Sequence, residues 1–165
     1  MPGKWKTVWP TVERREVVHA VRTTLAAVAS LLFARLFKMP EAYWAAITTM
    51  IVMQSTLGAA LTISRHRLVG TALGASMGAL TTIYLGRNVA CFGLVILVLG
   101  LICALLHLER TAYRYAGITA TIVMLVVRSQ AVWIIAMHRF IEISIGIVIV
   151  LAATALWPEQ RAASK

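Results

Sequence analysis

The chain contains the stretch Ala45-Ala46-Ile47-Thr48-Thr49-Met50-Ile51-Val52-Met53, and its second half contains the similar stretch Ala116-Gly117-Ile118-Thr119-Ala120-Thr121-Ile122-Val123-Met124. Six of the nine positions are identical, and an arginine follows each copy, at Arg67 and Arg139. Repetition of these residues at a nearly constant spacing along the chain indicates that one structural unit occurs twice. We therefore predict two repeats between short ends: an N-terminal cytoplasmic or interfacial segment 1–16, the repeats 17–86 and 87–158, and a cytoplasmic tail 159–165.

The composition of the 165-residue chain indicates a membrane protein. Apolar residues make up 60% of it, charged residues only 13%, and the mean hydropathy is +0.82. A soluble domain of this size would need more polar surface, whereas about 20 consecutive apolar residues cross a bilayer as a helix. We predict an all-α integral membrane protein with six transmembrane helices, at residues 17–37, 43–63, 67–86, 89–107, 113–127 and 133–157.

The number of helices in each repeat decides how the two repeats are oriented. Three crossings bring the chain to the opposite side of the membrane, so the second repeat would enter the bilayer upside down. We therefore predict an inverted repeat, the design of many transporters.

The net charge of +10 is distributed as expected for a membrane protein. With the N-terminus inside, the predicted cytoplasmic segments hold eleven Lys and Arg residues and the outer segments hold five. This bias favours cytoplasmic placement of both termini. No basic stripe is interleaved with aromatic residues, so we expect the lipid bilayer and not nucleic acid as the partner surface.

Two arginines at matching places are the first candidate for a functional site. An arginine at mid-bilayer costs about 2.5–3.5 kcal/mol even on a lenient insertion scale, so it normally faces a cavity or a partner. Arg67 and Arg139 would approach the midplane from opposite sides, and a guanidinium binds a carboxylate with two hydrogen bonds. The alternative is that both lie at helix ends, reach the lipid headgroups and only set the topology.

A polar break after each copy of the repeated stretch is the second candidate. The first copy is followed by Gln54-Ser55-Thr56-Leu57-Gly58 and the second by Arg128-Ser129-Gln130. Interrupted helices at matching places in two repeats indicate a transport site. If the second helix ends near Gln54, the third could begin near Gly58, which would move Arg67 deeper into the membrane. The alternative is a polar residue within a continuous helix.

Glu142 is the only acid deep inside a predicted span, and it follows Arg139 by three residues. This spacing places the two on one helix face, where they are expected to pair. A structural salt bridge is the favoured interpretation. The alternative is proton coupling, in which Glu142 releases a proton as an anion binds nearby.

A ladder of small residues is the last feature. Gly70, Gly74 and Gly78 are spaced by four, so they share one helix face and allow another helix to approach closely. We predict helix packing there, against a neighbour in the same chain or in another.

The sequence contains no arrangement typical of catalysis. It shows no metal-ligand cluster, no nucleophile–base pair and no phosphate loop, so we expect no enzyme activity, no cofactor and no metal site.

These residues resemble the membrane module of the fusaric acid resistance (FUSC) family, which takes in the aromatic acid exporters and to which the plant aluminium-activated malate transporters are similar. The resemblance covers about residues 17–158 and rests on Tyr43-Trp44, Gln54, Gly58 and the run Arg67-Leu68-Val69-Gly70-Thr71-Ala72-Leu73-Gly74. The chain departs from the family where members often have Gln-Pro, because Ser55 follows Gln54. Larger relatives also add a cytoplasmic domain or a second membrane module.

The resemblance implies a six-helix module that moves organic anions, typically aromatic carboxylates, out of the bacterial cytoplasm through the inner membrane. It points at Gln54, Gly58, Arg67, Gly70 and Thr71, and by symmetry at Arg139. A lone module is expected to form a homodimer or a higher homo-oligomer. With the residues of the polar breaks, the expected substrate-binding set is Arg67, Arg139, Gln54, Ser55, Gly58, Thr71 and Arg128.

Two hypotheses follow for the function. In the first, the protein is an exporter or channel for organic anions that uses its intramembrane arginines to attract them. In the second, it is a non-transporting membrane subunit that assembles with a partner protein through its glycine face. Flux of an aromatic acid through proteoliposomes distinguishes the two.

Overall fold

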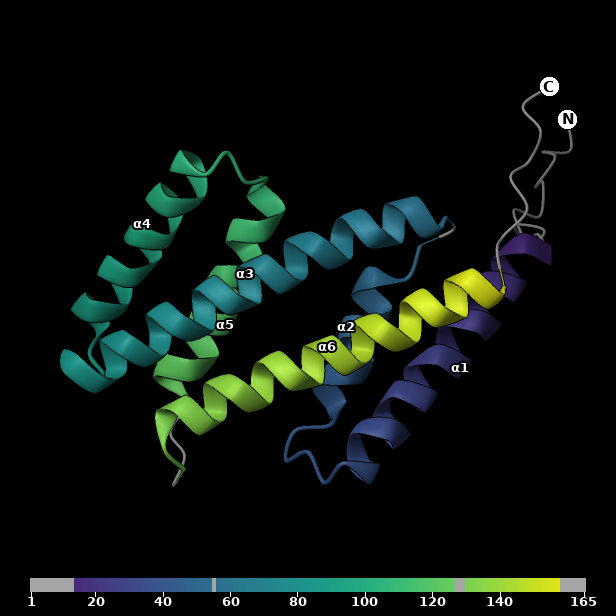
Figure 1. The fold of residues 1–165 in the computed structure, drawn as a ribbon, viewed down its shortest axis with the longest axis horizontal. Helices are drawn as coiled ribbons and strands as arrows, with labels where there is room; N and C mark the ends of the chain where they lie inside the picture. The colour runs from purple at the N-terminus through teal and green to yellow at the C-terminus, as the bar shows by residue number, and fades with distance from the viewer. Residues whose placement is uncertain (1–13, 55, 127–129, 158–165) are drawn as a thin grey trace, which may run out of the picture.

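A computed structural model describes residues 14–54, 56–126 and 130–157, and this part of the chain is folded into six helices without a strand (Figure 1). The all-α prediction and the number of helices are therefore confirmed. The helices are α1 (Arg14–Leu36), α2 (Tyr43–Val52), α3 (Leu57–Tyr84), α4 (Val89–Leu105), α5 (Arg110–Leu125) and α6 (Val132–Leu156).

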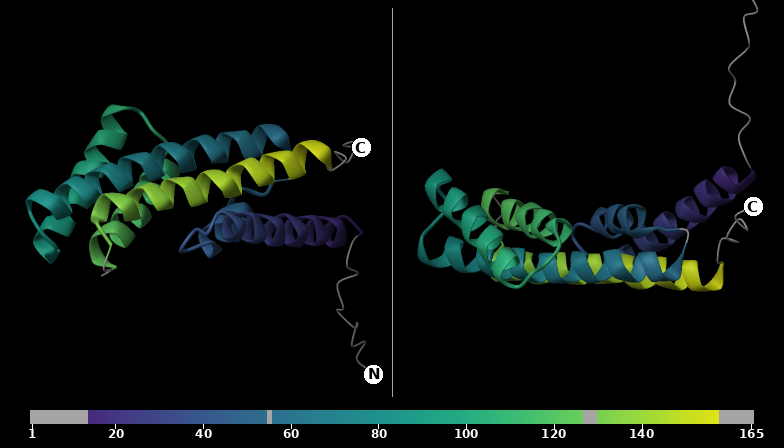
Figure 2. Two further views of the ribbon diagram at one scale, coloured as in Figure 1. Left: turned by 60° about the horizontal axis from the view of Figure 1, so that its bottom comes forward. Right: turned by 90° about the horizontal axis from the view of Figure 1, so that it is seen from above.

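The two longest helices, α3 and α6, lie side by side and run antiparallel (Figure 1). They form one layer, and α1, α2 and α5 lie on one side of it (Figure 2). The second helix of each repeat packs on the third helix of the other repeat: α2 lies against α6, and α5 lies against α3. This exchange and the antiparallel course of α3 and α6 support the predicted inversion of one repeat relative to the other.

Glycines at matching places allow these two exchanged contacts. A Cβ atom added to Gly74 would overlap the carbonyl oxygen of Ala116, and a Cβ added to Gly146 would overlap that of Ala45. Each glycine thus lets the backbones of two helices touch. The glycine ladder of α3 faces α5 of the same chain, since Gly70 approaches Ala112, Gly74 approaches Ala116 and Gly78 approaches Ala120.

The first polar break is present in the structure as an interruption between α2 and α3. Its position corrects the bounds of two predicted spans. The spans 43–63 and 67–86 are wrong because α2 ends at Val52 and α3 already begins at Leu57. Thr56 is the N-cap of α3, and its hydroxyl accepts a hydrogen bond from the Ala59 N–H (3.3 Å), which supplies one of the bonds that a helix start lacks. Arg67 therefore lies ten residues beyond the first residue of α3, or about 15 Å along the helix, and not at a helix end.

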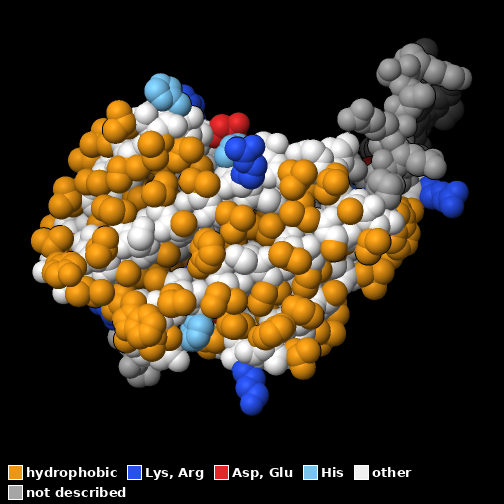
Figure 3. All heavy atoms as spheres, viewed as in Figure 1, with side chains coloured by type: hydrophobic (Ala, Val, Ile, Leu, Met, Phe, Trp, Pro, Cys, Tyr) orange, Lys and Arg blue, Asp and Glu red, His pale blue; other side chains and the backbone are white. Residues whose placement is uncertain are grey.

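Two of the described helices are long and apolar enough to cross a membrane by themselves, α1 from Glu16 onward and α6. The ten residues of α2 span about 15 Å, half of the hydrocarbon thickness. Six helices are thus present, but they are not six full spans. The surface is nonetheless apolar. On the face formed by α3 and α6, hydrophobic side chains predominate, and the visible Lys and Arg side chains lie toward its edge (Figure 3).

Candidate functional site

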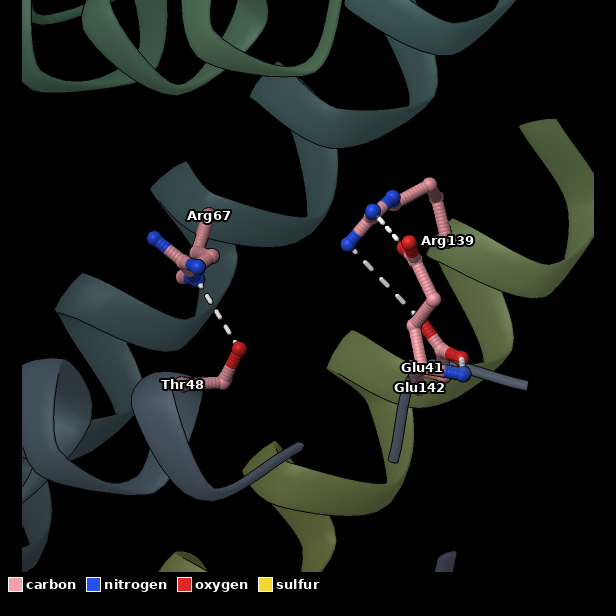
Figure 4. Close-up of polar contacts among 5 residues, drawn as sticks. All are labelled: Glu41, Thr48, Arg67, Arg139 and Glu142. Carbon is pink, nitrogen blue, oxygen red and sulfur yellow. Dashed lines mark hydrogen bonds and ion pairs between the residues drawn. The ribbon is translucent and has the colours of Figure 1, made fainter. Parts of the chain in front are cut away.

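The two matching arginines are buried on the adjacent helices α3 and α6 (Figure 4). Arg67 is 3% exposed and Arg139 is 2% exposed. Each guanidinium stacks on an aromatic ring from the other repeat: the Arg67 Cζ lies 4.7 Å from the centre of the Tyr115 ring, and the Arg139 Cζ lies 4.3 Å from that of Trp44. Trp44 and Tyr115 each directly precede a copy of the repeated stretch, so the repeat extends to the partners of the arginines.

Arg139 lies beside two carboxylates within the protein. It forms an ion pair with Glu41 of the α1–α2 loop, and its Nη1 lies 3.8 Å from the Glu142 Oε2 (Figure 4). Glu142 is fully buried and also accepts a hydrogen bond from the backbone N–H of Glu41 (2.9 Å). Arg139 and Glu142 are therefore close neighbours on one helix face. The cluster joins the α1–α2 loop to α6.

Arg67 has polar neighbours of a different kind. Its Nε donates a hydrogen bond to the hydroxyl of Thr48 (3.3 Å; Figure 4). Ser64 and Thr71 lie one turn before and one turn after it on α3; both are buried, and their hydroxyl groups have no hydrogen-bond partner among the described residues. Within the same part of the chain, no carboxylate forms an ion pair with Arg67.

The sequence explains why two matching sites differ in this way. When the copies of the repeated stretch are aligned, Ala112 takes the place of Glu41. When Arg67 is aligned with Arg139, Gly70 takes the place of Glu142, and the positions that match Ser64 and Thr71 are apolar, Ala136 and Ile143. One arginine is thus paired with acids of the protein itself, and the other has a hydroxyl group as its hydrogen-bond acceptor and two more hydroxyl-bearing residues one turn away on its own helix.

This arrangement has a clear chemical consequence. A buried charge without a partner is costly, and its environment normally supplies an opposite charge. Hydroxyl groups can donate to an anion but cannot neutralise a guanidinium. The surroundings of Arg67 therefore suit an oxoanion, which would accept hydrogen bonds from the guanidinium and from Ser64 and Thr71.

The structure brings together only some of the residues expected to bind substrate. Thr71 lies beside Arg67, whereas Gly58 lies nine residues earlier, in the first turn of α3, with open space around its Cα. Gln54 lies in the break, and its backbone carbonyl oxygen accepts a hydrogen bond from the Arg22 side chain. Ser55 and Arg128 lie outside the described residues.

Five residues of the site did not emerge from the sequence: Glu41, Trp44, Thr48, Ser64 and Tyr115. Thr48 belongs to the repeated stretch, and Trp44 and Tyr115 immediately precede its two copies, so an alignment of the copies could have identified these three. Ser64 could have been found from its place three residues before Arg67. Glu41 carried no such signal, because it is far from Arg139 in the chain and has no acidic counterpart in the second repeat.

Comparison with known protein families identifies the family of the chain. The family described as fusaric acid resistance protein-like matches residues 26–153, which is most of the chain and includes all of the site residues described above. The resemblance inferred from the sequence is therefore confirmed. No match was found among curated proteins or among solved structures.

Proposed function

Since the chain belongs to the fusaric acid resistance protein-like family, whose members are membrane transporters rather than enzymes, we propose that it carries organic anions across the membrane, as an exporter or a channel. Aromatic carboxylates are the substrate class that we expect. The observation that carries the proposal is the environment of Arg67: a buried guanidinium without an ion-pair partner in the described chain, with the unpartnered hydroxyl groups of Ser64 and Thr71 one turn away on either side along α3.

The energetics of Arg67 favour a bound anion. Its stacking on Tyr115 contributes up to about 2 kcal/mol when both groups are desolvated, and its hydrogen bond to Thr48 contributes about 1.5–3 kcal/mol. Neither contact neutralises the charge. A carboxylate would do so, and it could form two parallel hydrogen bonds with the guanidinium.

Arg139 takes a different role in this proposal. Because Glu41 and Glu142 lie against its guanidinium, Arg139 holds the α1–α2 loop on α6, and Arg67 is the residue that binds substrate. The contacts of Glu142 suit this tether, and its suggested role in proton coupling stays a prediction. So does the contribution of Ser55 and Arg128 to substrate binding.

The assembly and the location are part of the same proposal. We expect a homodimer or a higher homo-oligomer in a bacterial inner membrane, with both termini in the cytoplasm. The apolar outer face of α3 and α6 supports burial in lipid or against a second copy.

The proposal is tested by flux of a radiolabelled aromatic carboxylate into proteoliposomes that contain the purified protein. Arg67→Gln is expected to abolish the flux. Arg65→Gln is the matched control, because Arg65 is an exposed arginine two residues earlier on the same helix. If the correctly folded wild-type protein moves no carboxylate, the alternative of a non-transporting membrane subunit is favoured.

A further inference from the structure

A third buried arginine joins three helices at the end of the molecule where α2 and α6 terminate. Arg22 of α1 is 2% exposed. Its Nη1 donates a hydrogen bond to the carbonyl oxygen of Trp157 (2.7 Å), and its Nη2 donates one to that of Gln54 (2.7 Å). Trp157 directly follows α6, and Gln54 comes two residues after the end of α2.

The two acceptors explain why a guanidinium is found there. The last carbonyl groups of a helix lack intrahelical partners and carry about half a negative charge. At the end of α2, Val52 and Met53 are buried and the hydrogen bonds of Arg22 are partly buried, so water has restricted access to this helix end. A planar guanidinium offers several donors in a fixed arrangement, and Arg22 uses two of them to bind two helix ends at once.

Among the described residues of the second repeat, no arginine on α4 could make an equivalent contact. Helix α4 is the counterpart of α1, and its whole length, Val89–Leu105, contains no charged residue. Aligning the repeated stretches places Gly93 opposite Arg22, and aligning Arg67 with Arg139 places Leu94 there. The repeat fold therefore does not require an arginine at this place. Arg22 comes from the first repeat, whose short helix α2 supplies Thr48, the hydrogen-bond partner of Arg67.

We propose that Arg22 is a positioning residue for the anion site. Arg22 holds the chain just beyond α2. It thereby fixes the last turn of α2 and the start of the polar break between α2 and α3. The position of this break along the chain sets the depth of Arg67 in the membrane. Thr48 lies one turn before Val52, so a shift of the end of α2 moves the Thr48 hydroxyl relative to the Arg67 Nε. The effect on anion binding rests on the proposed function; the restraint on α2 does not.

Hydrogen–deuterium exchange of the protein in lipid nanodiscs tests the restraint directly. In Arg22→Gln, amide exchange in the last turn of α2 (residues 49–53) is expected to become about tenfold faster, because hydrogen bonds from a charged donor are lost there. The last turn of α5 (residues 122–126) is the internal reference and is expected to stay unchanged. Arg35→Gln, at an exposed arginine near the other end of α1, is the matched control and should leave both segments unchanged.

A second variant and a second readout complete the test. Arg22→Lys is expected to give intermediate exchange, because an ammonium group cannot reproduce the planar fork of donors. In proteoliposomes, Arg22→Gln should raise the KM for the carboxylate about tenfold with little change in maximal flux, and Arg22→Lys should restore part of the affinity.

The outcomes separate the two proposals. Unchanged exchange at residues 49–53, or an equal increase at residues 122–126, would overturn the positioning role of Arg22. Faster exchange at residues 49–53 with an unchanged KM would overturn its link to the anion site. If the wild-type protein transports no anion, the proposed function fails, and the exchange experiment still decides whether Arg22 restrains α2.

Discussion

The guanidinium of Arg67 stacks on the ring of Tyr115, 4.7 Å from its centre, although the two residues belong to different repeats. Arg139 and Trp44 repeat this contact between α6 and α2. The residues near these matching stacks differ: two acids lie beside Arg139, whereas Arg67 bonds to the Thr48 hydroxyl and has Ser64 and Thr71 one turn away on α3. This divergence assigns a structural role to Arg139 and an anion-binding role to Arg67 in the proposed function.

The hydroxyl groups beside Arg67 are expected to serve the ligand and not the fold. Thr71→Val and Ser64→Ala should each raise the KM for the carboxylate about 3- to 10-fold, since each removes one hydrogen bond to the anion. The thermal stability of the ligand-free protein should stay the same or rise, because each change removes a buried hydroxyl without a described partner. Flux assays and thermal unfolding check the two expectations.

Ser76→Ala is the control for these variants, because the Ser76 hydroxyl is exposed and bonds only to backbone carbonyls of its own helix. It should change neither the KM nor the stability. Loss of stability in Thr71→Val at constant KM would show that the hydroxyl is structural.

A carboxylate introduced beside Arg67 should inactivate the protein without unfolding it. Ala112 occupies the position that matches Glu41, so Ala112→Glu is expected to neutralise Arg67 as Glu41 neutralises Arg139. The flux of carboxylate should fall at least tenfold, because the internal acid competes with the substrate for the guanidinium. Transport and thermal unfolding of the purified variant measure the two effects.

Ala112→Gln is the matched control, with the same size and no charge. If both variants lose transport equally, the cause is steric, because Ala112 is fully buried against α3, and the argument from charge fails.

Removing one partner of the ion pair between Glu41 and Arg139 should destabilise the protein strongly. Glu41→Gln is expected to lower the free energy of unfolding by about 3–5 kcal/mol, because it leaves a buried guanidinium without this partner. Replacing both residues by glutamine should destabilise the protein by less than the sum of the single changes. Unfolding in mixed micelles measures this double-mutant cycle.

Glu109 provides the comparison. It is mostly exposed and lies 3.5 Å from His66, so Glu109→Gln should cost less than about 1 kcal/mol. A cost for Glu41→Gln as small as that would rule out the structural role given to Arg139.

The glycines at the helix crossings should tolerate no side chain. Gly74→Ala and Gly146→Ala are each expected to lower the free energy of unfolding by about 1–3 kcal/mol, because the added methyl group overlaps a backbone carbonyl of the facing helix. Thermal unfolding checks this prediction. Gly93→Ala is the control: nothing lies within 4 Å of its added Cβ, and alanine at a helix interior should stabilise by up to about 1 kcal/mol.

The helical architecture was predictable because its signals are local. Apolar runs and the repeated stretch give the number of helices, and four of the six predicted spans, beginning at 17, 89, 113 and 133, agree with the observed helices within three residues at both ends. The errors at α2 and α3 come from reading hydrophobicity alone across the break. Thr56, a residue type that favours the N-cap position, was the available signal for the start of α3.

The sequence by itself determined the helical class of the protein from its apolar runs, its family from the residues that carry the resemblance, and the matching pair Arg67 and Arg139 from the repeated stretch that precedes each of them. Only the tertiary structure decided that Glu41 neutralises Arg139, that Tyr115 lies under Arg67 and that Arg22 binds the ends of two helices. These contacts join residues that are far apart in the chain. They exist because α2 packs on α6 and α5 packs on α3. The glycine ladder indicates a close helix contact, but no local pattern specifies which helix is the partner.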